Sequence, residues 1–180
     1  DRISAFDVVM DQPIPGKGVI LTQMSSFWFG VIDKVMPNHV IATADDEAAM
    51  ASVEKTCALA ELTPELARRS MVIKKAERLD IECVVRNYIA GSAWAEYEQS
   101  GTMNGMPLPA GMKAADRFPE PVFTPSTKAA SGHDESLTPK EAQDLVGVEL
   151  HRELEDRSIE IFRVAHAYAA ERGMILVDTK

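Results

Sequence analysis

Two segments of this sequence present charged and hydroxyl side chains where apolar runs end. In "VVRNYIAGS", a β-type run delivers Arg86, and the Gly91-Ser92 pair then opens a helix. A guanidinium, a hydroxyl and the exposed N–H groups of a helix N-terminus together suit a phosphate or a carboxylate. A surface arginine beside a capped helix has the same spacing, so the pattern alone leaves both interpretations open.

The run "MILVDTK" ends in a second pair of charges. Asp178 and Lys180 are two residues apart, so in a strand their side chains lie on the same side. A buried apolar strand has no structural need for an acid and a base at its end. Contact with a metal, a nucleotide or a substrate is one interpretation of this pair, and a strand end without such a role is equally compatible with the sequence.

The segment "FTPSTKAASGHDES" is too polar for a core and lies in a stretch with little periodicity, residues 102–137. A loop of that length in a compact domain is usually functional or disordered. Lys128 could bind an anion, and His133-Asp134 could orient or deprotonate a group, although a solvated loop has the same composition. We do not infer a Ser-His-Asp hydrolase from one histidine near an aspartate. A fourth segment, "DRISAFD", favours a solvated turn over a site for Ser4 and Asp7.

Composition excludes several classes of protein. The chain has 180 residues, 46% of them hydrophobic, and a formal net charge of −9. That charge argues against general nucleic-acid binding. Cys57 and Cys83 form neither a metal motif nor a disulfide framework, which favours reduced thiols in the cytoplasm. The sequence shows no membrane-length apolar run, signal-peptide pattern, GxGxxG, P-loop or HExxH.

The elements that position these residues indicate an α+β fold. We expect the tryptophan and phenylalanines of the helix 22–36 to be core residues. Thr138 begins a capping box with proline at the first helical position. Strands are expected in two parts of 1–21 and at 39–44, 71–76, 80–90 and 174–178. Helices are expected at 22–36, 63–70, 92–100 and 138–173, with a helix or a mobile excursion at 45–62.

Taken together, "DRISAFD", "IECVVRNYIAGSAW", "FTPSTKAASGHDES" and "MILVDTK" resemble the phosphoribosylaminoimidazole-succinocarboxamide synthase (SAICAR synthetase) family along the whole chain. The resemblance implies a kinase-like, two-lobed α+β arrangement with antiparallel sheet and helices around an ATP cleft. It also implies a ligase of purine biosynthesis that uses ATP and Mg²⁺. The reaction joins the carboxylate of 5-amino-4-carboxyimidazole ribonucleotide (CAIR) to L-aspartate, with no nucleic-acid or membrane partner.

The resemblance also implies roles for individual residues. Arg86 and Ser92 would hold the imidazole nucleotide by its phosphate or carboxylate side. Glu82 would face the adenine pocket. Four further residues would contact substrate near the reacting groups: Lys128, Asp134, Asp178 and Lys180. Of these, Asp134 would hold the aspartate ammonium and help to remove its proton.

Two departures from the family pattern accompany the resemblance. Asp80 stands where the family usually has proline, which affects only a local turn. The family's glycine-containing ATP loop and its magnesium acids would lie outside residues 1–180, so we expect no metal ligands here and an inactive piece of a longer monomeric enzyme. Residues 1–84 would belong to the ATP-binding lobe and residues 85–180 to the substrate-binding lobe.

Two other functions remain open at this point. A noncatalytic nucleotide-binding piece would result if no glycine-rich loop preceded the chain. A kinase-like phosphotransferase without aspartate ligation is a weaker alternative, because it leaves the segment "FTPSTKAASGHD" unexplained.

Overall fold

The structure is a computed structural model that describes residues 2–5, 8–51, 53, 62–128 and 134–180. The chain divides into two compact units, Asp1–Glu77 and Arg78–Lys180. Residues 78–84 belong to the second unit, and the lobe boundary expected between residues 84 and 85 stays a prediction. The assignment of lobes to ATP and substrate stays a prediction. No helix in the described part of the chain is long and apolar enough to cross a membrane.

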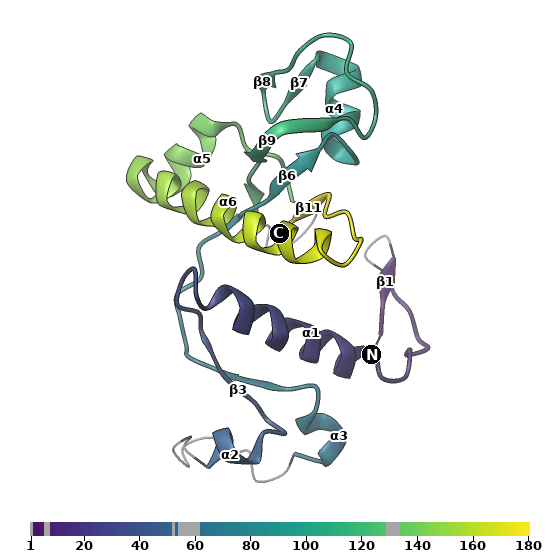
Figure 1. Cartoon of the computed structure of the whole chain (residues 1–180), viewed down its shortest axis with the longest axis vertical. Helices are drawn as coiled ribbons and strands as arrows, with labels where there is room; N and C mark the ends of the chain where they lie inside the picture. The colour runs from purple at the N-terminus through teal and green to yellow at the C-terminus, as the bar shows by residue number, and fades with distance from the viewer. Residues whose placement is uncertain (1, 6–7, 52, 54–61, 129–133) are drawn as a thin grey trace. The chain divides into compact units, whose positions relative to one another are not determined.

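The first unit combines one long helix with short antiparallel strand pairs (Figure 1). Strand β1 pairs with β2, and β3 pairs with β4. The helix α2 is capped by Asp46 and α3 by Thr63, whose side chains accept backbone N–H groups. The elements are β1 (Ser4–Ala5), β2 (Val8–Val9), α1 (Lys17–Ile32), β3 (Val40–Thr43), α2 (Glu47–Met50), α3 (Pro64–Ala67) and β4 (Met71–Ile73).

Two predictions for helix α1 were wrong. The apolar residues after Gly16 were assigned to a strand, but the helix already begins at Lys17. Gly16 has a φ of 80°, a conformation that glycine adopts at little cost, and it turns the chain directly into the helix. The aromatic residues were expected in a core, yet α1 contains no buried residue and Phe27 is 45% exposed.

The second unit is built on a three-stranded antiparallel sheet with the order β11-β6-β9. Strands β5 and β10 pair separately, and β7 and β8 form a hairpin. Helix α6 contacts β6 and β9 (Figure 1). The elements are β5 (Ile81–Glu82), β6 (Val85–Tyr88), α4 (Ser92–Ser100), β7 (Thr102–Met103), β8 (Met106–Pro107), β9 (Arg117–Phe123), β10 (Ser126–Thr127), α5 (Pro139–Val146), α6 (Val148–Ala170) and β11 (Asp178–Thr179).

The core of the second unit consists of two apolar clusters. One gathers Ile89, Met103 and Phe118 between α4 and the strands. The other packs Phe162 of α6 against Val85 and Phe123 of the sheet. Strand β6 is central to the unit, because it contributes Val85 to the second cluster and leads directly into Ile89 of the first. The mixture of helices and antiparallel strands confirms the predicted α+β class.

Several expectations for the second unit need correction. The helix predicted over 138–173 is two helices, because Gly147 has a φ of 87° and separates α5 from α6. Residues 102–137 are not one irregular stretch, since they contain four strands. The predicted buried strand at 174–178 was also wrong. Ile175 is 72% exposed, and β11 begins only at Asp178.

Candidate active site

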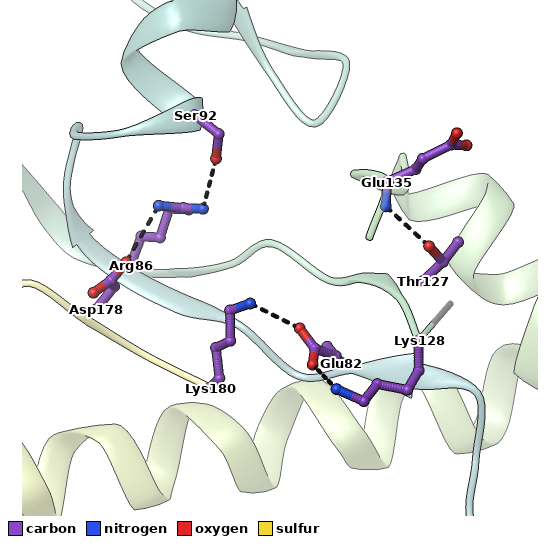
Figure 2. Close-up of polar contacts among 8 residues, drawn as sticks. All are labelled: Glu82, Arg86, Ser92, Thr127, Lys128, Glu135, Asp178 and Lys180. Atoms are coloured by element: carbon purple, nitrogen blue, oxygen red, sulfur yellow. Dashed lines mark hydrogen bonds and ion pairs between the residues drawn. The ribbon is translucent and has the colours of Figure 1, made fainter. Parts of the chain in front are cut away.

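Arg86 is the centre of the first group of site residues. Strand β6 carries it, and the antiparallel register places Asp178 of β11 directly opposite. The Arg86 guanidinium donates to Ser92 Oγ at 3.1 Å and to an Asp178 carboxylate oxygen at 3.4 Å (Figure 2). The Arg86 side chain is only 15% exposed. The structure therefore brings together three residues that the sequence singled out separately.

One N–H group of Arg86 lacks a partner. Its Nε is buried and has no hydrogen-bond acceptor among the described residues, while Nη1 lies 3.5 Å from the Ala90 carbonyl oxygen. An unsatisfied buried donor costs about 1–3 kcal/mol, and more when it is charged. An anionic ligand would relieve that cost with a charge-assisted hydrogen bond. The arginine is therefore a candidate anion-binding group.

Ser92 is held beside Arg86 by the turn that begins helix α4. Gly91 has a φ of 59°, a region that disfavours most side chains, and Ser92 is the first residue of the helix. No side chain caps this N-terminus. The predicted glycine turn and helix start are confirmed here, and they place the hydroxyl of the first helical residue within hydrogen-bond distance of the guanidinium.

Glu82 is the centre of the second group. Its side chain is 12% exposed and accepts from the ammonium groups of Lys128 and Lys180, the latter at 2.9 Å (Figure 2). Hydrogen bonds from Lys128 first, and then from Lys180, lower the pKa of Glu82 from 4.5 to about 2. The hydrogen bond between Lys128 and Glu82 also raises the pKa of Lys128 above its ordinary value. Lys128 is therefore held as a cation.

Strand pairing explains how these distant residues meet. In β5 and β10, Glu82 lies opposite Ser126, two residues before Lys128. The Lys128 backbone N–H also donates to the Asp80 carbonyl oxygen at 3.2 Å. Asp178 lies in β11 and Lys180 directly follows this strand, so one short segment supplies a partner to Arg86 and a partner to Glu82. The two groups of the site thus share this segment.

The described ends of the segment 123–136 form a narrow antiparallel arrangement. Ser126 bridges to Ser136, and the Thr127 N–H donates to the Glu135 carbonyl oxygen at 2.8 Å. In return, the Glu135 N–H donates to Thr127 Oγ1 at 2.9 Å (Figure 2). Asp134 is exposed, and its charge contributes to the raised pKa of Lys128.

Other expected residues are less informative. Asp7, Cys57 and His133 lie outside the described residues, and Ser4 lies in β1 of the first unit. Cys83 is a free cysteine whose pKa is raised by burial. Among the described residues, no group of three or more histidine, cysteine or acidic side chains could hold a metal ion.

The sequence analysis missed the hairpin of β7 and β8, which joins α4 to the rest of the unit. Asn104-Gly105 forms its turn, and both residues have positive φ values, 50° and 72°. Asn-Gly flanked by apolar residues is a strong sequence signal for such a turn. The signal was present in "TMNGMP", but the prolines and the weak periodicity of residues 102–137 favoured an irregular loop.

The geometry defines an α+β protein whose site combines a mostly buried arginine and two lysines with carboxylate partners, an arrangement suited to anionic ligands. The family model of SAICAR synthetase matches residues 1–180, so the chain belongs to the SAICAR synthetase family. The resemblance found in the motifs is confirmed.

Three similar proteins illustrate this relationship. A phosphoribosylaminoimidazole-succinocarboxamide synthase of Chromobacterium violaceum is 49% identical over 100% of this chain and 61% of its own length. The SAICAR synthase of Saccharomyces cerevisiae, solved in complex with SAICAR, is 38% identical with a TM-score of 0.84, covering 100% of this chain and 58% of its own. A SAICAR synthetase solved in complex with ADP shares the fold at 23% identity and a TM-score of 0.71, covering 99% and 62%. The chain thus spans about three fifths of the length of these relatives.

Proposed function

We propose that the complete gene product containing this chain is an ATP-dependent ligase. It joins the carboxylate of CAIR to the amine of L-aspartate and gives SAICAR, ADP and phosphate. Membership of the SAICAR synthetase family supports this activity, and so does the 38% identity to a yeast enzyme that was solved with SAICAR. The arrangement of cations in the second unit is compatible with it.

The chemistry explains why such a site needs cations. A carboxylate is a poor acceptor for an amine, so a carboxylate oxygen of CAIR first attacks the γ-phosphorus of ATP and ADP leaves. The aspartate amine then attacks the carbonyl carbon of this acyl phosphate, loses a proton, and phosphate leaves. All three substrates are anionic, whereas the chain has a net charge of −9. Positioning and local electrostatic stabilisation must therefore carry much of the catalysis.

The observation that carries the proposal is the unpaired, buried Nε of Arg86. In our proposal, Arg86 and Ser92 bind the phosphate or carboxylate side of CAIR, and the ligand supplies the missing acceptor. The free N–H groups at the start of α4 add a favourable partial charge.

The other residues follow from their positions. Lys128 would neutralise the CAIR carboxylate, and Asp134 would hold the aspartate ammonium and assist its deprotonation. Asp178 and Lys180 would contact the nucleotide substrate near the transferred phosphoryl group. Glu82, expected at the adenine pocket, keeps that predicted role, and its ion pairs suggest a second one. It holds the ammonium groups of both lysines in place.

ATP is proposed as a co-substrate, and Mg²⁺ would accompany its phosphates. The described residues do not supply a cluster of three metal ligands, so we derive no step through the ion. A cytoplasmic location and a monomeric state also remain predictions. Size-exclusion chromatography with light scattering would test the oligomeric state.

The decisive experiment uses the complete gene product with CAIR, ATP-Mg and L-aspartate. We expect ADP release to require both CAIR and L-aspartate, with SAICAR detected by mass spectrometry. D-aspartate is the matched control and should give little product. ADP release with CAIR alone would instead indicate a phosphotransferase. Nucleotide binding without any turnover would indicate a noncatalytic protein, and either result would overturn the proposal.

A further inference from the structure

The hairpin of β7 and β8 touches the segment that carries Lys128 and Asp134. The side chain of Asn104, at the turn of this hairpin, is buried. Its amide nitrogen Nδ2 donates to the carbonyl oxygen of Pro125 at 2.9 Å and to that of Leu137 at 2.8 Å. These two carbonyl groups belong to opposite sides of the segment, so one amide bridges its two stems, residues 125–128 and 134–137.

The partners of Asn104 fix the orientation of its amide. Both are carbonyl oxygens, which only accept, so the NH₂ group must face them and uses both of its protons. The stems are also tied directly, because the Leu137 N–H donates to the Pro125 carbonyl oxygen at 2.9 Å. Each of the two carbonyl groups is thus fixed at the point where the segment closes.

Helix α4 holds Asn104 itself in place. The carboxylate of Glu96 accepts from the backbone N–H groups of Asn104 at 2.9 Å and of Gly105 at 3.0 Å. It also accepts from Thr102 Oγ1 at 2.7 Å. These hydrogen bonds lower the pKa of Glu96 and stabilise a turn whose positive φ values would otherwise favour other conformations. The same helix begins at Ser92, beside Arg86.

A close approach between Gly105 and Thr138 supports the same connection between the hairpin and the stems. A Cβ atom added at Gly105 would lie 2.7 Å from the Thr138 methyl carbon, so the hairpin turn packs directly on the residue after Leu137. A cavity of about 140 Å³ adjoins the bridge and is lined by Asn104, Pro125 and Leu137 among others. It is smaller than the roughly 300–1,000 Å³ of typical ligand pockets.

We propose that Asn104 is a positioning residue that sets the separation of the two stems and thereby the placement of Lys128 and Asp134. Glu96 supports it from α4, so the helix that starts beside Arg86 also determines where the lysine and the aspartate stand. This proposal rests on the proposed function for its effect on catalysis, but the structural bridge does not depend on that function.

The test compares Asn104→Gly with the wild-type complete gene product. Glycine tolerates the positive φ and removes the side chain together with its amide. Because two hydrogen bonds to buried carbonyl groups are lost, we expect kcat/KM for L-aspartate to fall about 10- to 30-fold, with KM for ATP unchanged within about twofold. Hydrogen exchange should accelerate at Thr127, Glu135 and Leu137 and remain slow in β6 and β9.

Two further variants make the outcome specific. Asn104→Asp is nearly the same size but turns a carboxylate toward two carbonyl oxygens, so it should be at least as impaired as Asn104→Gly. Asn38→Gly is the matched control, because Asn38 also donates two hydrogen bonds from Nδ2, in the first unit. It should leave exchange in the two stems unchanged.

The two proposals fail in different ways. If the wild type does not make SAICAR, the proposed function fails, and exchange in the stems still tests the bridge. If the wild type is active and Asn104→Gly changes neither kcat/KM nor exchange in the stems, the positioning role is refuted. Faster exchange throughout the second unit would also refute it, because Asn104 would then serve general stability alone.

Discussion

The ion pairs of Glu82 predict a stability that depends on pH in a defined window. The change is Glu82→Gln, which keeps the size of the side chain and removes its charge. In the folded protein the pKa of Glu82 is about 2, against an ordinary value of 4.5. The stabilisation is therefore fully present above about pH 4.5 and is lost as the pH falls toward 2.

The magnitude follows from this difference. At about 1.4 kcal/mol per pH unit, the lowered pKa corresponds to an upper limit of about 3 kcal/mol. Lys128 and Lys180 are 41% and 65% exposed, and water screens such pairs, so exposed ion pairs usually contribute about 0.2–1 kcal/mol each. We therefore expect Glu82→Gln to lower the free energy of unfolding at pH 7 by about 1–2 kcal/mol.

Urea unfolding of the wild type and Glu82→Gln between pH 7 and pH 3 would measure this difference. It should be constant from pH 7 to about pH 5 and should shrink below that. Glu149→Gln, on the exposed start of α6, is a control for loss of one negative charge. A difference below about 0.3 kcal/mol at pH 7, or one that stays constant down to pH 3, would refute the argument.

Three other substitutions test separate parts of the structure. Arg86→Ala should raise KM for CAIR, by the equivalent of about 2–5 kcal/mol for a mostly buried charge, and an unchanged KM in steady-state assays would remove Arg86 from the site. Asp134→Asn should lower kcat/KM for L-aspartate about tenfold or more with an unchanged melting temperature, whereas unaltered kinetics would show that Asp134 has no catalytic role. Gly105→Ala should cost about 1–3 kcal/mol of unfolding free energy, because the new methyl group meets Thr138 and the φ of 72° is strained for alanine. Equal urea midpoints for that variant and the wild type would contradict the close approach.

Local signals in the sequence predicted the parts of the fold that depend on neighbouring residues. The capping box of Thr138 and Glu141 is present, with Pro139 at the first helical position. The turn at Gly91 and the start of α4 at Ser92 are also as expected. In each case the hydrogen bonds or the backbone conformation involve residues only a few positions apart, so their identities suffice.

Predictions failed where a longer context decides. The apolar run before Asp178 looks like a buried strand, but no neighbouring strand covers Ile175 in the described part of the chain. Gly147 interrupts a continuous helical pattern by its backbone conformation, which the pattern of apolar residues does not reveal. The partners of Glu82 are 46 and 98 residues away, so only the folded structure shows that one carboxylate holds two lysines.

The sharing of β11 between the two groups of the site makes its register critical. The strand has two residues, and Asp178 faces Arg86 while Lys180, the residue after the strand, reaches Glu82. A slip of one residue would put Thr179 opposite Arg86 and send both charged side chains to the other face of the sheet. The arginine and the glutamate would then lose their partners in the same event. The charge balance of the whole site is therefore set by the pairing of one very short strand.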